Sequence, residues 1–405
     1  MLSRFFHSWD EYPRQFWLMF FGMLISTVGS SMIWPFLMVY ASARLKLPLT
    51  AVASLMTLNA TMGLIFAFIA GPLTDRLGRK WVMVFSLVTN GLGYLFLSGA
   101  NTYPLFAAMM ALNGAVNPLY RVGADAMLAD LVPPEKRADA YSLTRMSNNI
   151  GISVGPAIGG FIATSSYSLA FYLAAAGLSA YGLLLALFAR ETLSKETAQL
   201  PKERFGGYGV VLHDRKFISF TVVFTLTQIA ASMLWVLLSV YTKTNFNMPE
   251  SQYGLLPTTN AILVVIFQIA ITRVTKKYPA LRVLALGSLL YAVGVTSLAW
   301  GRGFWGFWLS MVVFTIGEMI LMPTSSTYAA NQAPETMRGR YMSIYGLTWG
   351  LASGIGPIYG GFLNDNISPV AIWYGAGLVG MISAVVFAYM ANRSRKAAAA
   401  LPEES

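Results

Sequence analysis

The chain of 405 residues contains no cysteine and little charge, and both absences narrow its possible functions. Without cysteine there are no disulfide bonds, no thiol nucleophile and no cysteine metal site. Charged residues make up only 11% of the chain, whereas a soluble domain carries roughly 25%. A water-facing surface cannot be built from so few charges, so a soluble enzyme or binding domain is excluded.

Histidine and nucleotide-binding motifs are scarce as well. The two histidines, His7 and His213, lie in polar segments outside the apolar runs, which argues against a haem or a histidine metal site. The chain has no Gly-x4-Gly-Lys-Ser/Thr pattern, so ATP is not expected as the energy source. We therefore expect no metal, no cofactor and no catalytic residue, and the chain is not predicted to be an enzyme.

Apolar residues account for 56% of the chain and gather in long runs. A helix needs about 20 apolar residues to cross a bilayer, whereas the strands of a membrane β-barrel are about 10 residues long and alternate in polarity. The runs therefore predict an all-α membrane protein with twelve transmembrane helices. These spans are placed at 16–41, 50–72, 80–99, 103–131, 138–163, 167–190, 217–242, 252–272, 281–300, 304–330, 338–363 and 368–391.

Basic residues are distributed unevenly between the two sides of the predicted membrane. The formal net charge is +11, from 28 basic and 17 acidic residues. The few bases that lie inside spans or on the side away from the termini are Arg44, Lys46, Arg121, Arg145, Lys243 and Arg302. Because cytoplasmic loops gather Lys and Arg, we predict a multi-pass protein of the cell inner membrane with both termini in the cytoplasm. The same bias explains the basic charge without nucleic acid as a partner.

The two halves of the chain repeat each other. The segment 137–161 aligns with 338–362 at a constant offset of 201, and Arg, Ser, Gly-Pro, Gly-Gly and Phe recur in register. The longest polar stretch, 191–216, separates the halves. We therefore predict two pseudo-symmetric six-helix bundles around a central pathway. The predicted parts are an N-terminal bundle at 1–190, a cytoplasmic central loop at 191–216 and a C-terminal bundle at 217–405.

The segment 71–83, GPLTDRLGRKWVM, places an acid among bases where two predicted helices meet. The fourth span ends near another acid, and more bases follow on the same side of the membrane. Carboxylates and guanidiniums in these loops can pair between helices and hold one conformation, so we name them the latch. Its candidate residues are Gly71, Asp75, Arg76, Gly78, Arg79, Lys80, Asp130 and Arg137.

The same residues carry a resemblance to a known family. The segment 71–80 is similar to the loop 2–3 motif of the major facilitator superfamily. The segment 151–160, GISVGPAIGG, resembles the Gly-x-x-x-Gly-Pro-x-x-Gly-Gly motif of that family's proton-coupled antiporters, and the matching residues are Gly151, Gly155, Pro156, Gly159 and Gly160. With its twelve spans and repeated halves, the chain resembles the twelve-helix drug:proton antiporter branch. This resemblance implies the major facilitator fold, alternating access and a proton gradient as the energy source.

The chain departs from that pattern at two places. The branch usually has an arginine four residues before a glycine in helix 4. Here Met110 precedes Gly114 at that spacing, and the basic residue of this helix is Arg121. The second-half counterpart of the loop motif, 272–282, lacks the Asp and the Gly, so the latch is expected mainly in the first half.

Four charged residues lie well inside predicted spans, where each costs roughly 2.5–3.5 kcal/mol to insert. Arg121 and Asp125 are spaced i, i+4 and share a helix face. With Arg145 they form either a neutralised structural cluster or a substrate or proton-coupling site. Glu318 has no basic residue at i±3 or i±4, and it is either a neutral carboxyl group that packs or a group that gains and loses a proton. We name Glu318 and Asp125 as the candidate proton-coupling residues.

Polar and aromatic residues inside the spans supply the candidate substrate cavity. The resemblance implies a cavity lined by helices 1, 4, 7 and 10 with parts of 5, 8 and 11, although the same side chains can instead contact the bundle or the lipid. The 21 methionines and the 14% aromatic content favour a deformable apolar cavity. The candidates are Trp34, Asn117, Arg121, Arg145, Gln228, Trp235, Asn260, Gln268, Tyr345 and Trp349.

The preferred function is proton-coupled efflux of lipophilic or amphiphilic small molecules. The expected partners are a small-molecule substrate, protons and membrane lipids, and the expected state is a monomer. Within transport, the alternatives are export of a specific metabolite such as a sugar or amino acid, or translocation of a lipid. Outside transport, a membrane sensor or a scaffold remains open.

Overall fold

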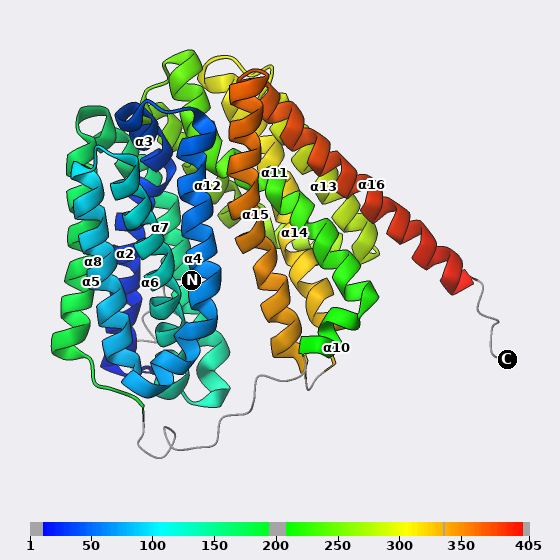
Figure 1. The fold of residues 1–405 in the computed structure, drawn as a ribbon. Helices are drawn as coiled ribbons and strands as arrows, with labels where there is room; N and C mark the ends of the chain where they lie inside the picture. Colours follow the sequence, from blue (N-terminus) through cyan, green and yellow to red (C-terminus); the bar gives the residue numbers. More distant parts are fainter. Residues whose placement is uncertain (1–10, 194–207, 335–336, 400–405) are drawn as a thin grey trace. The chain divides into compact units, whose positions relative to one another are not determined.

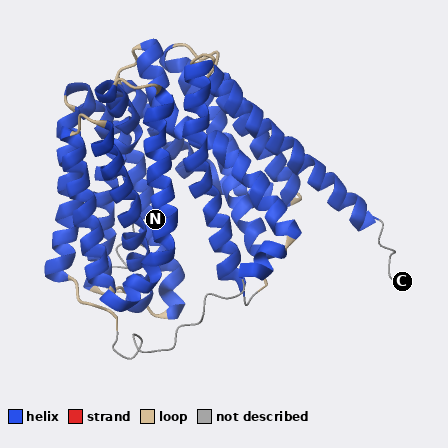
Figure 2. Cartoon of the chain, in the orientation of Figure 1, coloured by secondary structure: helices blue, strands red, loops and turns tan. Residues whose placement is uncertain are grey.

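The computed structural model describes residues 11–193, 208–334 and 337–399, and no strand occurs in this part of the chain (Figure 2). Apolar runs form helices because a backbone in lipid must satisfy its own hydrogen bonds. The helices of the first half are α2 (Arg14–Ile33), η1 (Trp34–Phe36), α3 (Leu37–Leu45), α4 (Leu49–Leu77), α5 (Arg79–Gly99), α6 (Tyr103–Leu131), η2 (Pro134–Lys136), α7 (Arg137–Ser165) and α8 (Tyr167–Phe188). Those of the second half are α10 (Tyr208–His213), α11 (Arg215–Phe246), α12 (Glu250–Thr275), α13 (Ala280–Ser297), α14 (Gly303–Gln332), α15 (Arg338–Asn366) and α16 (Ala371–Ala399).

Each predicted span coincides with one long helical segment, the first being α2, η1 and α3 together. In the described part of the chain, nine segments are long and apolar enough to cross a membrane. The helices α6, α7 and α15 have the length but do not meet that criterion, because they carry more polar residues. The all-helical membrane architecture predicted from the sequence is confirmed. The predicted central loop, 191–216, includes α10 and the first two residues of α11, and its residues 194–207 lie outside the described ranges.

The chain divides into two compact units. Unit 1 comprises Met1–Lys46, Leu58–Lys202 and Pro249–Thr258, and unit 2 comprises Leu47–Thr57, Glu203–Met248 and Thr259–Ser405. Two helices, α4 and α12, therefore have residues in both units. The first residues of α4 belong to unit 2, and the first residues of α12 belong to unit 1.

The same helix pairs build each unit. In unit 1, α2 packs against α7 and α8, and α5 packs against α6 and α8, which Figure 1 shows side by side. In unit 2, α11 packs against α15 and α16, and α13 packs against α14 and α16. Each unit-1 helix corresponds to the unit-2 helix at the same place in the repeat, so the packing follows the repeat that the sequence contains.

Candidate functional site

Glu318 lies in the middle of α14 in unit 2, and an amide holds its carboxylate. Asn260 Nδ2, from α12, donates hydrogen bonds to Glu318 Oε2 at 2.6 Å and to Thr315 Oγ1 at 3.0 Å. Asn260 is buried and Glu318 is half-buried. The sequence indicates both residues separately, and the structure joins them in one site. Glu318 forms no ion pair with any described residue, so a neutral donor is its partner.

Aromatic rings surround the same turns of α14. Tyr291 of α13 stacks on Phe314 with ring centroids 4.2 Å apart, and Trp235 of α11 meets Phe314 edge-on at 6.0 Å. Tyr291 is fully buried, and its hydroxyl has no hydrogen-bond partner among the described residues. Glu318 therefore has one amide donor, and this aromatic cluster lies one turn before it on α14. In such surroundings a proton on the carboxyl group removes the cost of burying its charge.

Two glutamines predicted for the cavity differ in their roles. Gln268 Nε2 donates to the backbone oxygen of Met319 at 2.9 Å and to Thr272 Oγ1 at 3.0 Å. The bond to Met319 ties α12 to α14, whereas the bond to Thr272 stays within α12, so Gln268 supports the helix that carries Glu318. Gln228 of α11 is buried, and its Oε1 accepts no hydrogen bond from a described residue. Gln228 therefore keeps an acceptor available for a ligand or water.

The remaining cavity candidates of unit 2 are aromatic. Tyr345 of α15 shares a hydrogen bond with Ser325 at 2.8 Å and stacks on Phe224 at 5.4 Å, so it joins the packed core of the unit. Trp349, one turn further along α15, is exposed. In unit 1, Trp34 opens the turn η1 and Asn117 lies within α6, and both side chains are exposed. A part in substrate binding stays a prediction for all four of these residues.

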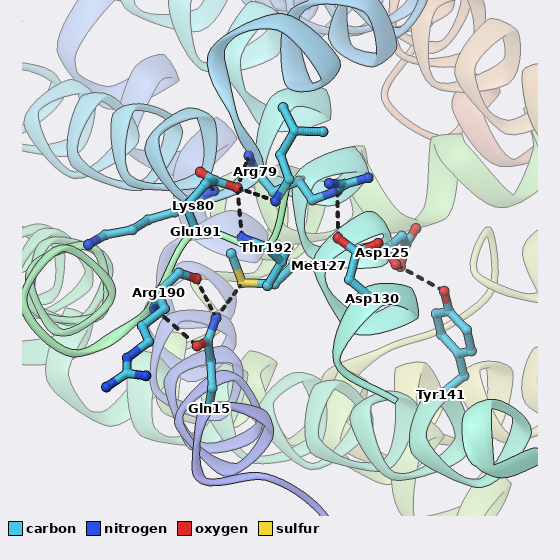
Figure 3. Close-up of polar contacts among 11 residues, drawn as sticks. Gln15, Arg79, Lys80, Asp125, Met127, Asp130, Tyr141, Arg190, Glu191 and Thr192 are labelled. Carbon is cyan, nitrogen blue, oxygen red and sulfur yellow. Dashed lines mark hydrogen bonds and ion pairs between the residues drawn. The ribbon is translucent and has the colours of Figure 1, made fainter. Parts of the chain in front are cut away.

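The charged residues of α6 and α7 do not form the compact cluster that their spacing allows. Arg121, Asp125 and Arg145 are all exposed, and none forms an ion pair within the described ranges. Arg121 and Asp125 interact only at longer range. Tyr141 of α7 donates to the backbone oxygen of Asp125 at 3.0 Å and leaves the carboxylate untouched (Figure 3). A shared helix face therefore does not bring these exposed side chains into direct contact, and both the neutralised cluster and the substrate or proton-coupling site stay predictions.

Neutralising Arg121 and Asp125 together is accordingly expected to show weak coupling. We expect the double-mutant cycle of Arg121→Gln and Asp125→Asn to give about 1 kcal/mol or less, as exposed ion pairs do. The measurement is the thermal unfolding of the purified chain in detergent. The cycle of Arg79→Gln and Asp130→Asn is the matched control and should couple more strongly, because Arg79 is buried. Equal coupling in the two cycles would contradict the geometry.

One ion pair of the latch joins Arg79 at the start of α5 to Asp130 at the end of α6. Arg79 Nε lies 3.0 Å from Asp130 Oδ2, which links α5 to the end of α6 within unit 1 (Figure 3). The N–H is not aligned for a hydrogen bond, so the contact is an ion pair. Lys80 Nζ lies over the ring of Trp81 at 4.8 Å. The ion pair ties the start of α5 to α6, whereas the contact between Lys80 and Trp81 is local to α5.

Glu191, which the sequence did not single out, completes this cluster. The backbone N–H groups of Arg79 and Lys80 donate to Glu191 Oε1 at 2.9 Å and to Oε2 at 3.0 Å (Figure 3). A carboxylate just beyond α8 therefore caps the N-terminus of α5, where the helix dipole is positive. Gly78 makes room for it, with φ of +92° and no Cβ, which would lie 2.4 Å from Glu191 Oε2.

Removing this cap should loosen the start of α5. We expect Glu191→Ala to lower the free energy of unfolding by about 1–2 kcal/mol, the usual cost of losing a helix cap. Thermal unfolding in detergent measures the loss. Glu135→Ala is the matched control, since Glu135 is an exposed acid in η2. An equal effect of the two substitutions would show that Glu191 is an ordinary loop acid.

The other latch residues are placed differently. Arg137 Nε donates to the backbone oxygen of Val132 at 3.1 Å and so closes the turn before α7. The members that lie in the last turns of α4 are Gly71, Asp75 and Arg76. A Cβ at Gly71 would meet no atom within 4 Å, so close helix packing is not its role.

The glycines of the predicted antiporter motif form a packing stripe on α7. Gly151, Gly155 and Gly159 are spaced i, i+4, i+8 and face α2. A Cβ at each would come within 3 Å of an atom of α2, and at Gly159 it would lie 2.1 Å from the backbone oxygen of Met32. Such glycines let two helix backbones approach closely. Pro156, inside α7, presents its backbone oxygen to Gly254 of α12, where a Cβ would lie 2.3 Å away.

Two hydrogen bonds related by the repeat hold the first turns of α4 and α12. In unit 1, Thr258 Oγ1 of α12 donates to the backbone oxygen of Ser153 in α7 at 3.0 Å. In unit 2, Thr57 Oγ1 of α4 donates to the backbone oxygen of Gly354 in α15. Donors and acceptors are both separated by the repeat offset of 201. Unit 1 therefore holds the beginning of α12, and unit 2 the beginning of α4, by equivalent hydrogen bonds.

Two glycines make room for the beginnings of α12 and α4. A Cβ at Gly160 would lie 2.4 Å from the backbone oxygen of Glu250, where α12 begins. A Cβ at the repeat-related Gly361 would lie 2.8 Å from the backbone nitrogen of Thr50, near the start of α4. Asp365 Oδ2 accepts from both the backbone N–H and the hydroxyl of Thr50 at 2.7 Å. The second glycine of each repeated Gly-Gly pair thus leaves room for the start of a neighbouring helix.

Comparison with known proteins agrees with this fold. A family model described as Major Facilitator Superfamily matches residues 19–231 and 220–405. A Na⁺, Li⁺, K⁺/H⁺ antiporter of Planococcus maritimus is 27% identical over 378 residues, 85% of this chain and 87% of that protein. A quinolone resistance protein, NorA of Staphylococcus aureus, is 23% identical over 376 residues, 92% of this chain and 96% of that protein.

Solved structures share the arrangement at low sequence identity. The crystal structure of the nucleoside transporter NupG has a TM-score of 0.79 and 13% identity and covers 93% of this chain and 99% of its own. A POT family transporter in complex with a peptide has a TM-score of 0.76 and 18% identity, with 95% and 98% covered. At this identity the likeness extends to the fold alone.

Proposed function

We propose that this chain, which belongs to the Major Facilitator Superfamily, exports lipophilic or amphiphilic small molecules in exchange for protons. As a member of that family it is a multi-pass membrane transporter and not an enzyme. We further propose that it works as a monomer in the inner membrane with both termini in the cytoplasm. The observation that carries the proposal is the Glu318 carboxylate, which accepts a hydrogen bond from Asn260 one turn along α14 from the stacked ring of Phe314.

Proton binding at Glu318 changes the bond that joins α12 to α14. The charged carboxylate accepts a short hydrogen bond from Asn260 Nδ2. Once protonated, the carboxyl group loses its charge, and this charge-assisted bond weakens. Asn260 lies two residues beyond Thr258, where α12 passes from unit 1 to unit 2. In this proposal, a proton at Glu318 weakens the contact of α14 with α12, a helix that has residues in both units.

An apolar, aromatic environment supports a lipophilic substrate. Trp235, Tyr291 and Phe314 form a continuous ring contact beside Glu318, and aromatic faces attract lipophilic and cationic groups. A cationic amphiphile can compete with a proton for the Glu318 carboxylate, which couples the two fluxes. The similarity to a quinolone resistance protein supports the same class of substrate.

A second candidate is the exchange of monovalent cations for protons. The relative from Planococcus maritimus bears that activity in its name, and the exposed carboxylate of Asp125 could receive a cation. Export of a sugar or amino acid and lipid translocation have no comparable support in the geometry.

The proposed function is tested with purified chain in liposomes that carry a pH-sensitive dye inside. We expect a quinolone and ethidium to be accumulated when a pH gradient is imposed, and to lose accumulation when a protonophore collapses it. Proton movement driven by Na⁺ or K⁺, without movement of either drug, would favour the second candidate. Failure of all four solutes to couple to protons, relative to protein-free liposomes, would refute both.

A further inference from the structure

A groove on unit 2 lies apart from the Glu318 site. It has a volume of about 500 Å³ and is bounded by α12, α13 and α14. Its wall is almost wholly apolar and includes Ile271, Val274, Leu286, Ile316 and Ile320. Several of these side chains are exposed, which in a membrane protein places them against acyl chains. The groove therefore has the chemistry of a site for a hydrocarbon chain.

One end of the groove is strongly basic. Arg282 and Tyr278 line it. Arg273 lies in the last turn of α12, and Lys276 and Lys277 lie in the connection between α12 and α13. All four bases are exposed. Within the described residues none of them forms an ion pair or donates a side-chain hydrogen bond. Positive charge thus gathers at one end of an apolar groove, and no acid of the described residues pairs with it.

The bases and the apolar side chains lie at different positions along the groove. The helix α12 ends at Thr275 and α13 begins at Ala280, so the bases lie where the chain turns at the membrane surface. Leu286 lies four residues beyond Arg282, about 6 Å further along α13. A ligand that satisfies both ends must therefore be an amphiphile with an anionic head and a long apolar tail. A free phosphate would leave the wall uncovered, and a neutral lipid would leave the bases unpaired.

We propose that this groove binds an anionic phospholipid. Its phosphate contacts Arg282, whose guanidinium can donate two parallel hydrogen bonds, while Lys276 and Lys277 add longer-range attraction. One acyl chain fills the groove between α12, α13 and α14. Tyr278, with an apolar ring and a polar hydroxyl, lies at the level where head and tail meet. Basic pockets between membrane helices bind anionic headgroups in this way.

Native mass spectrometry of the full chain in detergent tests the proposal. The delipidated protein is titrated with dioleoyl phosphatidylglycerol or with dioleoyl phosphatidylcholine, which share the same acyl chains. We expect the protein to bind the anionic lipid more tightly. Removing each base should weaken that binding about fivefold, so Lys277→Gln with Arg282→Gln should cost about 25-fold. The matched control, Arg393→Gln with Arg395→Gln, removes the same charge from exposed positions of α16 and should change little.

A second variant tests the groove itself. Ala270 lines it, so Ala270→Trp should block the acyl chain and abolish binding of phosphatidylglycerol while every base is retained. Equal binding of the two lipids, or equal loss in the charge variant and its control, would overturn the proposal. Unchanged lipid binding by Ala270→Trp would place the lipid elsewhere. A protein dimer that Ala270→Trp dissociates would make a second copy of the chain the occupant and overturn it as well.

Discussion

Glu318→Gln is expected to abolish gradient-driven transport while leaving the chain folded. Glutamine has the shape of the protonated carboxyl group but cannot exchange a proton. Its Oε1 can still accept from Asn260 Nδ2, which now donates at 2.6 Å to the carboxylate, and a buried neutral amide costs less than a buried charge. We expect substrate accumulation under a pH gradient to fall more than tenfold, with passive substrate exchange retained. Both are measured in liposomes with and without the gradient.

Two comparisons make this result interpretable. Asn260→Leu removes the donor but keeps the proton-binding carboxyl group, so it should alter the pH dependence of transport without abolishing coupling. Asp125→Asn neutralises the exposed carboxylate of α6 and should leave coupling intact. Full gradient-driven accumulation by Glu318→Gln, together with its loss in Asp125→Asn, would move the proton site to unit 1.

Element positions could be predicted from the sequence because they depend on runs of one residue class. Each span needs only enough consecutive apolar residues to cross the bilayer. Pairings between residues depend instead on how each helix is rotated about its own axis, and that is decided by packing against several neighbours. The bond between Asn260 and Glu318 joins positions 58 residues apart, and no spacing in the sequence signals it. Glu191 was missed for a related reason, since a loop acid that caps a distant helix resembles any solvated loop acid.

The repeat predicted more than the spans alone, but it could not assign the ends of helices. An offset of 201 relates the segments around Pro156 and Pro357, and the structure packs α7 on α2 and α15 on the repeat-related α11. Which neighbour each segment receives is a property of the fold. The first turns of α4 and α12 cluster away from the rest of their own helices. The hydrogen bonds from Thr57 and Thr258 are related by the repeat. They cannot be predicted from it, because the sequence does not show that each helix start packs in the other unit.

The repeated glycines of α7 and α15 are expected to differ sharply in their tolerance of alanine. Gly159 and Gly360 occupy the same place in the repeat. A Cβ at Gly159 would lie 2.1 Å from the backbone oxygen of Met32, which cannot move unless α2 separates from α7. A Cβ at Gly360 would meet the Cδ1 of Leu237 at 2.3 Å, the end of a side chain that can change rotamer. The same substitution therefore meets backbone in unit 1 and a flexible side chain in unit 2.

We expect Gly159→Ala to destabilise the chain by about 3 kcal/mol, near the upper end for overpacking, and Gly360→Ala by about 1 kcal/mol. Gly346→Ala is the control, because a Cβ there would meet nothing within 4 Å. Alanine favours the helix by about 1 kcal/mol over glycine, so the control should be neutral or slightly stabilising. Thermal unfolding in detergent ranks the three variants, and transport in liposomes should fall in the same order. Equal losses at Gly159 and Gly360 would mean that the motif acts through glycine flexibility and not through the contact between α2 and α7.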